Sequence, residues 1–518
     1  MRVLITASGI QNYIFAINAQ SAGARLRGRS ARLGLVIDYC LDCLCNKYPG
    51  RFDVVRNAGS RLEVEFPEPP ADLAAFLSEL RTRLDRFSKD DLRGQVWFAV
   101  ASGESTQSMH YALALGKLTQ GRALLQTPAA GASISWNESA FLLSPNPERH
   151  LDKEAARKLP ESQFGLALVR PESRYLWFST EPSATGHAVG IVDSFAVLEK
   201  TPPAQGLAWA LDDDAASVAK IGRKRLARYA PPCGDHLCDF DEIANRSSGA
   251  RFLGVLKADL DNLGSTFAEF HPDKEGQKGA KELSERLQFL FTEELEHLLT
   301  QPFPHCYVVY SGGDDLFLLG PWDQILRFID VFQRKLKQSV ARWGHPQLAL
   351  SAGFRLAHPK SPVRYLAEDV DAALEAAKAH TEGKDKPPHK DCISVFERVL
   401  RWDELHDGIE WADKLSVAVK GGMLSTGFLQ RMQFYGNESR RFYEKHAIDG
   451  LRMVPLLQND WSRNINQIGQ TLRDELNRQV LPLLVQATEK GERMWCIMDF
   501  ATRFTSYAVR EGSSANGR

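Results

Sequence analysis

Acidic residues stand at the ends of two apolar segments in the second half of the chain. Phe252 to Leu256 run into Asp259, and Cys306 to Tyr310 run up to a turn made of Gly312, Gly313, Asp314 and Asp315. Leu316 to Leu319 then run away from that turn. An apolar–turn–apolar pattern predicts a β-hairpin, because glycine supplies the backbone freedom that a tight turn needs.

Three carboxylates held close together repel one another, so either a cation lies among them or one takes up a proton. Two divalent ions bound by aspartates are the apparatus of phosphoryl and nucleotidyl transfer. We therefore predict that Asp259, Asp314 and Asp315 bind two Mg²⁺ or Mn²⁺ ions and are catalytic. Gly312 and Gly313 lack side chains and allow a nucleotide to approach the backbone. The alternative is an ordinary surface turn rich in Asp and Gly.

Composition restricts the class of protein. The chain has 518 residues, 43% of them hydrophobic and 25% charged, with a net charge of −1. A uniformly basic nucleic-acid-binding protein is excluded, so RNA contacts require local patches or neighbouring subunits. No apolar run reaches the roughly 18 residues that span a bilayer, and the N-terminal segment lacks the apolar core of a signal peptide. The eight cysteines are scattered, which argues against a disulfide framework. We expect a cytoplasmic protein without membrane contact.

The order of elements predicts an α+β fold with an internal duplication. Residues 251–400 follow the pattern β-α-ββ-α-β-α-β, a ferredoxin-like palm with one extra strand, Cys392–Phe396. Residues 1–127 repeat this order: a strand leads to Ser8, and Ala58, Gly59, Ser60 and Arg61 stand where the second copy has its glycines and aspartates. We therefore expect a first palm without metal ligands and a catalytic second palm.

The sequence pattern predicts a small intervening α/β domain over residues 128–250. It predicts a helical domain over residues 401–518. The intervening region contains short strands and a basic helix over Lys220–Tyr229. Cys233 and Cys238, with His236 between them, hint at zinc, but a structural zinc site needs four ligands and no second pair lies nearby. We do not expect a complete zinc site there.

Several motifs resemble the large polymerase subunit of type III CRISPR effector complexes, in its Csm form. The resembling segments are Ser8–Phe15, Leu26–Ser30, Phe240–Ala244, Leu256–Gly264, Ser311–Asp315 and Ala377–Lys378. The resemblance implies two palms of GGDEF and cyclase type, an intervening domain that often carries cysteines, and a C-terminal helical domain. It also implies an enzyme that condenses ATP into cyclic 3′–5′ oligoadenylate messengers of antiviral defence when target RNA pairs with guide RNA.

The implied partners are ATP, guide and target RNA, and the backbone and small subunits of the ribonucleoprotein. Many relatives begin with an HD nuclease domain, whereas this sequence starts at the first palm, so no DNA nuclease activity is expected. The family's cysteine site also looks eroded here.

Further site residues are predicted around the aspartates. The Leu260 carbonyl is expected to add a metal ligand, and the resemblance to GGDEF-type palms implies that Lys378 holds phosphates. Ser311 and Asn262 are candidates for hydrogen bonds to a base or ribose, although both residue types also suit turns. Ser8, Gly59 and Ser60 of the first palm are candidates for holding an acceptor nucleotide.

Two other functions remain open at this point. One is a diguanylate-cyclase-like enzyme that uses GTP; such enzymes normally have a single palm that dimerises, so the duplication argues against it. The other is a catalytically silent scaffold of the RNA-guided complex, which retention of all three aspartates disfavours.

Overall fold

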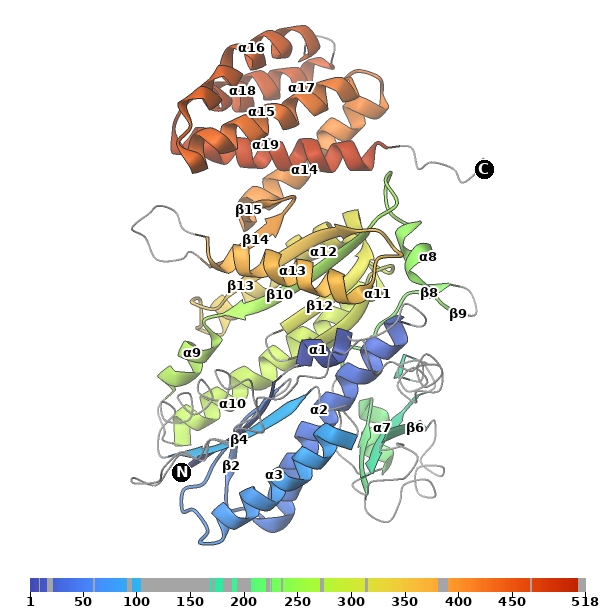
Figure 1. The fold of residues 1–518 in the computed structure, drawn as a ribbon, viewed down its shortest axis with the longest axis vertical. Coiled ribbons are helices and arrows are strands. Elements are labelled where there is room, and N and C mark those ends of the chain that lie inside the picture. The colour runs from blue at the N-terminus through green and yellow to red at the C-terminus, as the bar shows by residue number, and fades with distance from the viewer. Residues whose placement is uncertain are drawn as a thin grey trace, which may run out of the picture.

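Figure 1 shows the arrangement of the chain in a computed structural model. The structure describes residues 1–8, 10–15, 22–58, 61–90, 96–103, 168–169, 173–179, 189–192, 206–219, 224, 226–233, 236–270, 274–312, 315–380, 390–465 and 468–510.

The first palm contains a four-stranded antiparallel sheet with the order β2-β3-β1-β4. Its strands are β1 (Arg2–Ser8), β2 (Asp53–Ala58), β3 (Arg61–Glu65) and β4 (Trp97–Gly103). Its helices are α1 (Ile10–Phe15), α2 (Ala22–Lys47) and α3 (Leu73–Asp90). Val3, Leu4 and Ile5 are all fully buried. Because successive residues point to opposite faces of a sheet, β1 is covered on both faces.

The second palm contains a six-stranded sheet with the order β11-β12-β10-β13-β14-β15. Its strands are β10 (Leu253–Asp261), β11 (Tyr307–Gly312), β12 (Asp315–Pro321), β13 (Ala349–Ala357), β14 (Cys392–Val395) and β15 (Arg398–Arg401). All neighbours pair antiparallel except β13 and β14, which are parallel. The first four strands along the chain take the same order as those of the first palm.

The sequence predicted one extra strand after the last helix of this palm, whereas the structure has two. β14 and β15 form a hairpin across Phe396 and Glu397, whose φ angles are 49° and 65°. Phenylalanine and glutamate rarely adopt positive φ, so the sequence carries no turn signal at this point.

Helices cover both faces of the second sheet. They are α10 (Lys274–Phe289), a π-helical turn (Leu290–Glu294), α11 (Leu295–Thr300), α12 (Trp322–Arg342) and α13 (Val363–Lys378). Leu256 and Ala258 on one face of β10 share a core with α12. Helix α13 lies on the opposite face so closely that a Cβ at Gly353 would come within 2.4 Å of the Leu374 nitrogen. The absence of a side chain at position 353 thus permits this approach.

The two palms share one hydrophobic core. Val3 and Ile5 of the first sheet belong to the same buried cluster as Val255 of the second, and the rings of Phe15 and Phe317 lie 4.9 Å apart. Helix α2 contacts the edge strand β11, and α10 contacts the edge strand β2; Figure 1 shows α10 reaching down beside the first sheet. Each palm therefore contributes a helix to the edge strand of the other.

The described part of the intervening region has two small sheets and two short helices. These elements are β5 (Tyr175–Ser179), β6 (Val189–Val192), β7 (Gly206–Ala210), α7 (Asp213–Ala219), β8 (Pro232–Cys233), β9 (His236–Leu237) and α8 (Phe240–Ala244). The predicted basic helix over Lys220–Tyr229 is wrong in its described residues, because 224 and 226–229 are neither helix nor strand. This segment lies along β11, where the Val308 N–H donates to the Tyr229 carbonyl (3.3 Å).

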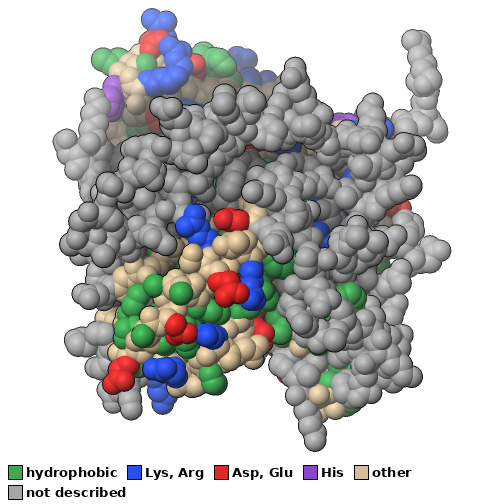
Figure 2. Space-filling view, turned by 60° about the horizontal axis from the view of Figure 1, so that its bottom comes forward, with side chains coloured by type: hydrophobic (Ala, Val, Ile, Leu, Met, Phe, Trp, Pro, Cys, Tyr) green, Lys and Arg blue, Asp and Glu red, His purple; other side chains and the backbone are tan. Residues whose placement is uncertain are grey.

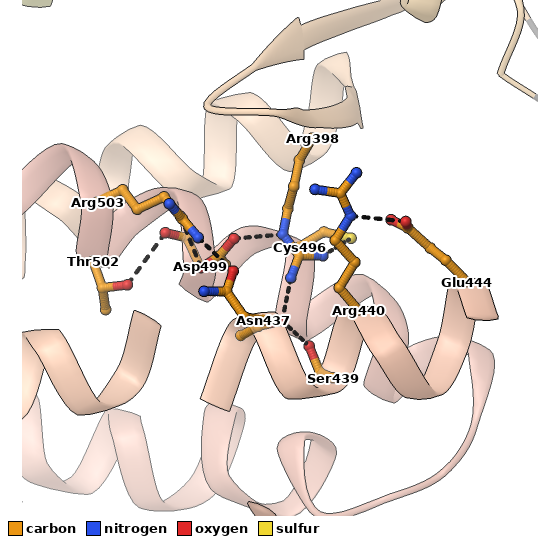
Figure 3. Close-up of polar contacts among 10 residues, drawn as sticks. Arg398, Asn437, Ser439, Arg440, Glu444, Cys496, Asp499, Thr502 and Arg503 are labelled. Atoms are coloured by element: carbon orange, nitrogen blue, oxygen red, sulfur yellow. Dashed lines mark hydrogen bonds and ion pairs between the residues drawn. The ribbon is translucent and has the colours of Figure 1, made fainter. Parts of the chain in front are cut away.

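The C-terminal region is helical, as predicted. It comprises α14 (Trp402–Lys420), α15 (Thr426–Lys445), α16 (Met453–Asn464), α17 (Gln470–Glu475), α18 (Leu481–Leu484) and α19 (Glu489–Ala508). Figure 3 shows how it is joined to the second palm. Arg398 of β15 pairs with the buried Asp499 of α19 and donates to the Gly436 carbonyl of α15. Arg503 contacts the other oxygen of Asp499 at 3.0 Å.

One face of the molecule carries mixed charge where it is described. Figure 2 views the face at the bottom of Figure 1, where Lys and Arg side chains are interspersed with Asp and Glu side chains and with hydrophobic ones. This distribution agrees with the net charge of −1. None of the helices within the described ranges has the length and apolarity to cross a membrane.

Candidate active site

The predicted hairpin is present. β11 and β12 pair up to Gly312 and Asp315, so only two residues connect them. Those two, Gly313 and Asp314, lie outside the described residues. Asp315 is the first residue of β12 and its side chain is half-buried.

Strand register brings Asp259 next to the hairpin end. Asp259 lies directly opposite Asp315 on β12 and opposite Ser351 on β13. Side chains that face each other across antiparallel strands have Cβ atoms about 4.5–5.5 Å apart. Two acidic side chains from segments more than fifty positions apart in sequence thus lie side by side on one face of the sheet.

Lys378 is the last residue of α13 and contacts Asp259 of this acidic pair. Its Nζ lies 2.6 Å from Oδ2 of Asp259, and both side chains are about a quarter exposed (25% and 24%). Burial alone would lower the pKa of Lys378, but the hydrogen bond and the charge of Asp259 raise it above its ordinary value. Lys378 therefore remains an ammonium that offsets part of the negative charge at Asp259.

Asp261 was not assigned a role from the sequence, yet it is the most buried acid in this region. It is 2% exposed; its Oδ2 accepts from Ser351 Oγ (2.5 Å) and from the Asp391 N–H (3.3 Å). Its Oδ1 is buried without a hydrogen-bond partner among the described residues. Burial raises the pKa of Asp261, and the charge of Asp259 adds to that rise. The available signal was its spacing, because residues two apart on a strand share a face.

Leu260 and Asn262 complete the end of β10. The Leu260 side chain is 3% exposed in the core with Leu256, so only its backbone is available to a ligand. Asn262 has φ 62°, which asparagine tolerates better than most residues, and precedes α9 (Leu263–Glu269). Its Nδ2 donates to the Gln347 carbonyl at 3.0 Å. The Asn262 side chain therefore has a local structural partner.

A cavity of about 810 Å³ lies between the two palms and the intervening region. Its volume falls in the range of roughly 300–1,000 Å³ that is typical of small-molecule sites. Its lining residues include Arg27, Asp38, Arg56 and Asn57 from the first palm and Ser311, Gly312 and Asp315 from the second. The hairpin end therefore forms part of the cavity wall, and Asp259 lies beside Asp315 on the adjacent strand β10.

Ser311 has an additional local contact at this wall. Its Oγ donates to the Phe291 carbonyl at 2.5 Å, and Phe291 belongs to the π-helical turn. The hydroxyl hydrogen is thus used internally, and the oxygen retains the capacity to accept a hydrogen bond.

The first palm has no acidic pair at the matching positions. Ala58 pairs with Arg61 at the end of the β2–β3 hairpin, and Arg61 lies opposite Thr6 of β1. Thr6 and Arg61 are therefore the positional counterparts of Asp259 and Asp315. Of the residues proposed to hold an acceptor nucleotide, Ser8 ends β1 opposite Trp97, whereas Gly59 and Ser60 lie outside the described residues.

Cys233 and Cys238 form a disulfide in the structure. The hint of zinc at these residues is thereby corrected, because sulfurs bonded to each other are not the thiolates that zinc binds. Glu242 has a carboxylate oxygen within 4.8 Å of both sulfurs, and together they make three groups rather than four. The argument against a disulfide framework did not anticipate this local pair, which closes the short β8–β9 hairpin.

Two parts of the chain match known protein families. Residues 252–387 match the Cas10/Cmr2 second palm domain, and residues 3–110 match the Csm1 subunit domain B. The single-strand-specific deoxyribonuclease Cas10/Csm1 (subtype III-A) of Enterococcus italicus is 25% identical over 554 residues. The chain is a homologue of Cas10/Csm1.

The alignment covers 98% of this chain and 66% of the E. italicus protein. The chain therefore spans about two thirds of that relative's length. Solved Csm1 structures share the fold. Csm1 in a Csm1–Csm4 cassette with one ATP superposes with a TM-score of 0.69 at 19% identity, covering 98% of this chain and 70% of that one. A cassette in complex with cA3 gives a TM-score of 0.67 at 18% identity, covering 98% and 69%.

Proposed function

We propose that this Cas10/Csm1 homologue is a nucleotidyltransferase that condenses ATP into cyclic 3′–5′ oligoadenylates. The observation that carries the proposal is the cross-strand pair Asp259 and Asp315, with the Lys378 ammonium 2.6 Å from Asp259. Asp315 of this pair lines a nucleotide-sized cavity. Csm1 structures of the same fold contain ATP or cA3. Its partners would be guide and target RNA and the other subunits of a type III CRISPR complex.

The donor set suits divalent cations. Asp259 and Asp315 offer carboxylate oxygens and Leu260 a backbone carbonyl, the hard oxygen ligands that Mg²⁺ and Mn²⁺ prefer; Asp314 is the further proposed ligand. Bound metal ions would lower the pKa of an attacking hydroxyl and neutralise charge on the triphosphate.

The protein's own residues then orient the nucleotide. Lys378 is close enough to Asp259 to hold a phosphate oxygen as a point charge beside the acidic pair. Gly312 lets a nucleotide approach β11 without meeting a side chain, and the Ser311 oxygen can accept from a ribose hydroxyl or a base amine. Asp261 fixes the end of β10 to β13 through Ser351. Asn262 stays a candidate ligand of the base.

The finer fold assignment belongs to the same proposal. The strand order shared by the two sheets supports ferredoxin-like palms of the GGDEF and cyclase type. We retain the proposed domains at residues 1–127, 128–250, 251–400 and 401–518.

ATP turnover tests this function directly. The purified chain, with and without a reconstituted guide–target complex, is incubated with Mg²⁺ or Mn²⁺ and either ATP or GTP, and products are resolved by mass spectrometry. Cyclic oligoadenylates that disappear in the Asp314→Ala/Asp315→Ala variant support the proposal. Products from GTP alone would indicate a diguanylate-cyclase-like enzyme, and no product under any condition would favour a scaffold. A parallel incubation with single-stranded DNA measures the activity for which the relatives are named.

A further inference from the structure

The face of β10 that meets α13 carries a lysine beside the acidic pair. Lys257 and Asp259 are two residues apart, so their side chains lie on one face of the strand. The Lys257 side chain is 8% exposed, and its Nζ donates to Oδ1 of Asp371 on α13. Asp259 contacts Lys378 on the same helix. Two ion pairs of opposite polarity therefore join β10 to α13.

The two ion pairs lie at different levels of α13. Asp371 precedes Lys378 by seven residues, which corresponds to two helical turns or about 10.5 Å. On β10 the step from Lys257 to Asp259 is about 6.6 Å at roughly 3.3 Å per residue, and a lysine side chain is long enough to span it. Lys257 is thus within reach of two acids, Asp259 on its own strand and Asp371 on the helix, and the structure pairs it with Asp371.

The two lysines differ in how easily they can leave an acid. The Lys378 side chain is 25% exposed at the end of α13, so it can exchange Asp259 for water or for a phosphate oxygen. The Lys257 side chain is 8% exposed in the middle of β10. A buried ammonium without an acid is costly, so Lys257 cannot return to water in the same way.

Loss of the Asp371 carboxylate would therefore redirect Lys257. Asp259 is the next acid along the same face of β10, and Asp315 lies opposite it. A buried lysine that pairs with these carboxylates would occupy the oxygens that bind metal and cancel part of the charge that attracts it.

We propose that Asp371 is a positioning residue of the metal site: it binds the Lys257 ammonium and so leaves the Asp259 and Asp315 carboxylates available to a divalent cation. Asp371 acts through Lys257 rather than by contact with the ion. This role rests on the proposed function for the presence of a metal ion at the acidic pair, and it does not depend on which nucleotide is used.

A structural role alone makes a different prediction. If the Lys257–Asp371 pair only clamps α13 to β10, loss of either partner removes the clamp. Lys257→Met, Asp371→Asn and the double variant would then be impaired alike. If Asp371 instead restrains the charge of Lys257, removal of Lys257 reverses the loss that Asp371→Asn causes.

The test is Mn²⁺ binding to the full chain without nucleotide, followed by the electron paramagnetic resonance signal of free Mn²⁺. Asp259→Asn identifies the fraction that is bound at the acidic pair. We expect Asp371→Asn to weaken this binding about tenfold or more, the loss that is usual when partners of metal ligands are replaced. Asp371→Glu should keep most of the affinity, and Lys257→Met/Asp371→Asn should return close to the wild-type affinity.

Glu368→Gln is the matched control. Glu368 lies on the same helix and pairs with Arg364 at 2.9 Å, with both side chains about half exposed. The change removes one negative charge from α13 without freeing a buried cation, so the Mn²⁺ affinity should stay unchanged.

Thermal melting of each metal-free variant reports folding. If Asp371→Asn does not fold, Lys257→Met alone still decides between the two roles. A clamp predicts weaker Mn²⁺ binding in Lys257→Met, whereas restraint of the Lys257 charge predicts unchanged or tighter binding.

The outcomes separate the two proposals. Equal losses in the single and double variants, or wild-type affinity in Asp371→Asn, overturn the role of Asp371 even if ATP turnover is normal. A wild-type chain without Asp259-dependent Mn²⁺ binding overturns it as well. Recovery of Mn²⁺ binding in the double variant of a chain that makes no product would instead overturn the proposed function and leave the role of Asp371 standing.

Discussion

The two palms place different side chains at the same positions of the same sheet order. At the end of the hairpin the second palm has Asp315 opposite Asp259, whereas the first has Arg61 opposite Thr6. Both hairpins are connected through two residues, and both edge strands have a register shift, between Val54 and Arg56 and between Val308 and Tyr310. The two palms therefore share the backbone positions at the hairpin end and differ in the charge of the side chains placed there.

The largest effect is expected when the acidic pair is neutralised. Asp259→Asn should reduce ATP turnover at least about a hundredfold, because a metal-binding carboxylate stabilises the transition state electrostatically. The matched change in the first palm, Thr6→Val, should reduce it less than about threefold. Pyrophosphate release measures both. Equal losses in the two variants would mean that the first palm also serves the chemistry.

A large effect on stability is expected at the joint between the second palm and the C-terminal helices. Arg398→Ala removes one of the two arginine partners of the buried Asp499 and leaves only Arg503. It should lower the free energy of unfolding by about 3 kcal/mol, the lower end of the range for a broken buried ion pair. Arg440 pairs with Glu444 at 2.8 Å nearby on the surface, and Arg440→Ala should lower it by less than about 1 kcal/mol. Urea titration of both variants makes the comparison; similar values would show that Arg398 is not a major contact between the two regions.

A moderate effect is expected at Lys378. Lys378→Met should raise KM for ATP about tenfold by removing a charged hydrogen-bond donor to phosphate, while Lys378→Arg should retain most of the affinity. Steady-state kinetics at constant ionic strength measures this. An unchanged KM with a lower melting temperature would limit Lys378 to its ion pair with Asp259.

The smallest expected effect concerns the pH dependence of folding stability, to which one aspartate of each palm contributes with opposite sign. Burial raises the pKa of Asp261, so from the usual value near 3.9 up to this raised pKa the folded state binds more protons and stability falls as pH rises. Asp72 before α3 has a lowered pKa, chiefly through a hydrogen bond from Lys47, so its contribution is present above pH 3.9 and is lost as pH falls through the lowered value.

Asp261→Asn should therefore reduce the loss of stability that accompanies a rise in pH above about 4. Asp72→Asn should remove the stability that the ionised Asp72 contributes above its lowered pKa. Thermal unfolding between pH 3 and pH 7 checks both signs. A steeper loss in Asp261→Asn than in the wild type would contradict the assigned direction.

Much of the two sheets could be predicted from the sequence. Apolar runs that end at Ser8 and at Asp259 predicted the central strands, and glycine-containing turns at 59 and 312 predicted the hairpins. These signals are local, because strand period and turn chemistry act over a few residues. The meeting of Asp259 with Asp315 was also expected, although their roles stay predictions.

The remaining features depend on contacts that are distant in sequence. Residues 226–229 carry a helix-like composition, but they lie along the edge strand β11, where the Val308 N–H donates to the Tyr229 carbonyl. In the sequence Asp261 looks like an ordinary acidic turn residue. Its buried environment depends on hydrogen bonds from Ser351 and Asp391, which are distant in sequence.

Helix α13 ends in Lys378 and rests on the sheet where Gly353 has no side chain. At this point the backbone of α13 packs directly against the backbone of β13, so the distance between helix and strand is fixed. The distance between α13 and β13 determines how far the Lys378 side chain must extend to contact Asp259. The absence of one methyl group at position 353, one helical turn before Lys378, thus helps to set the distance between the Lys378 ammonium and the Asp259 carboxylate.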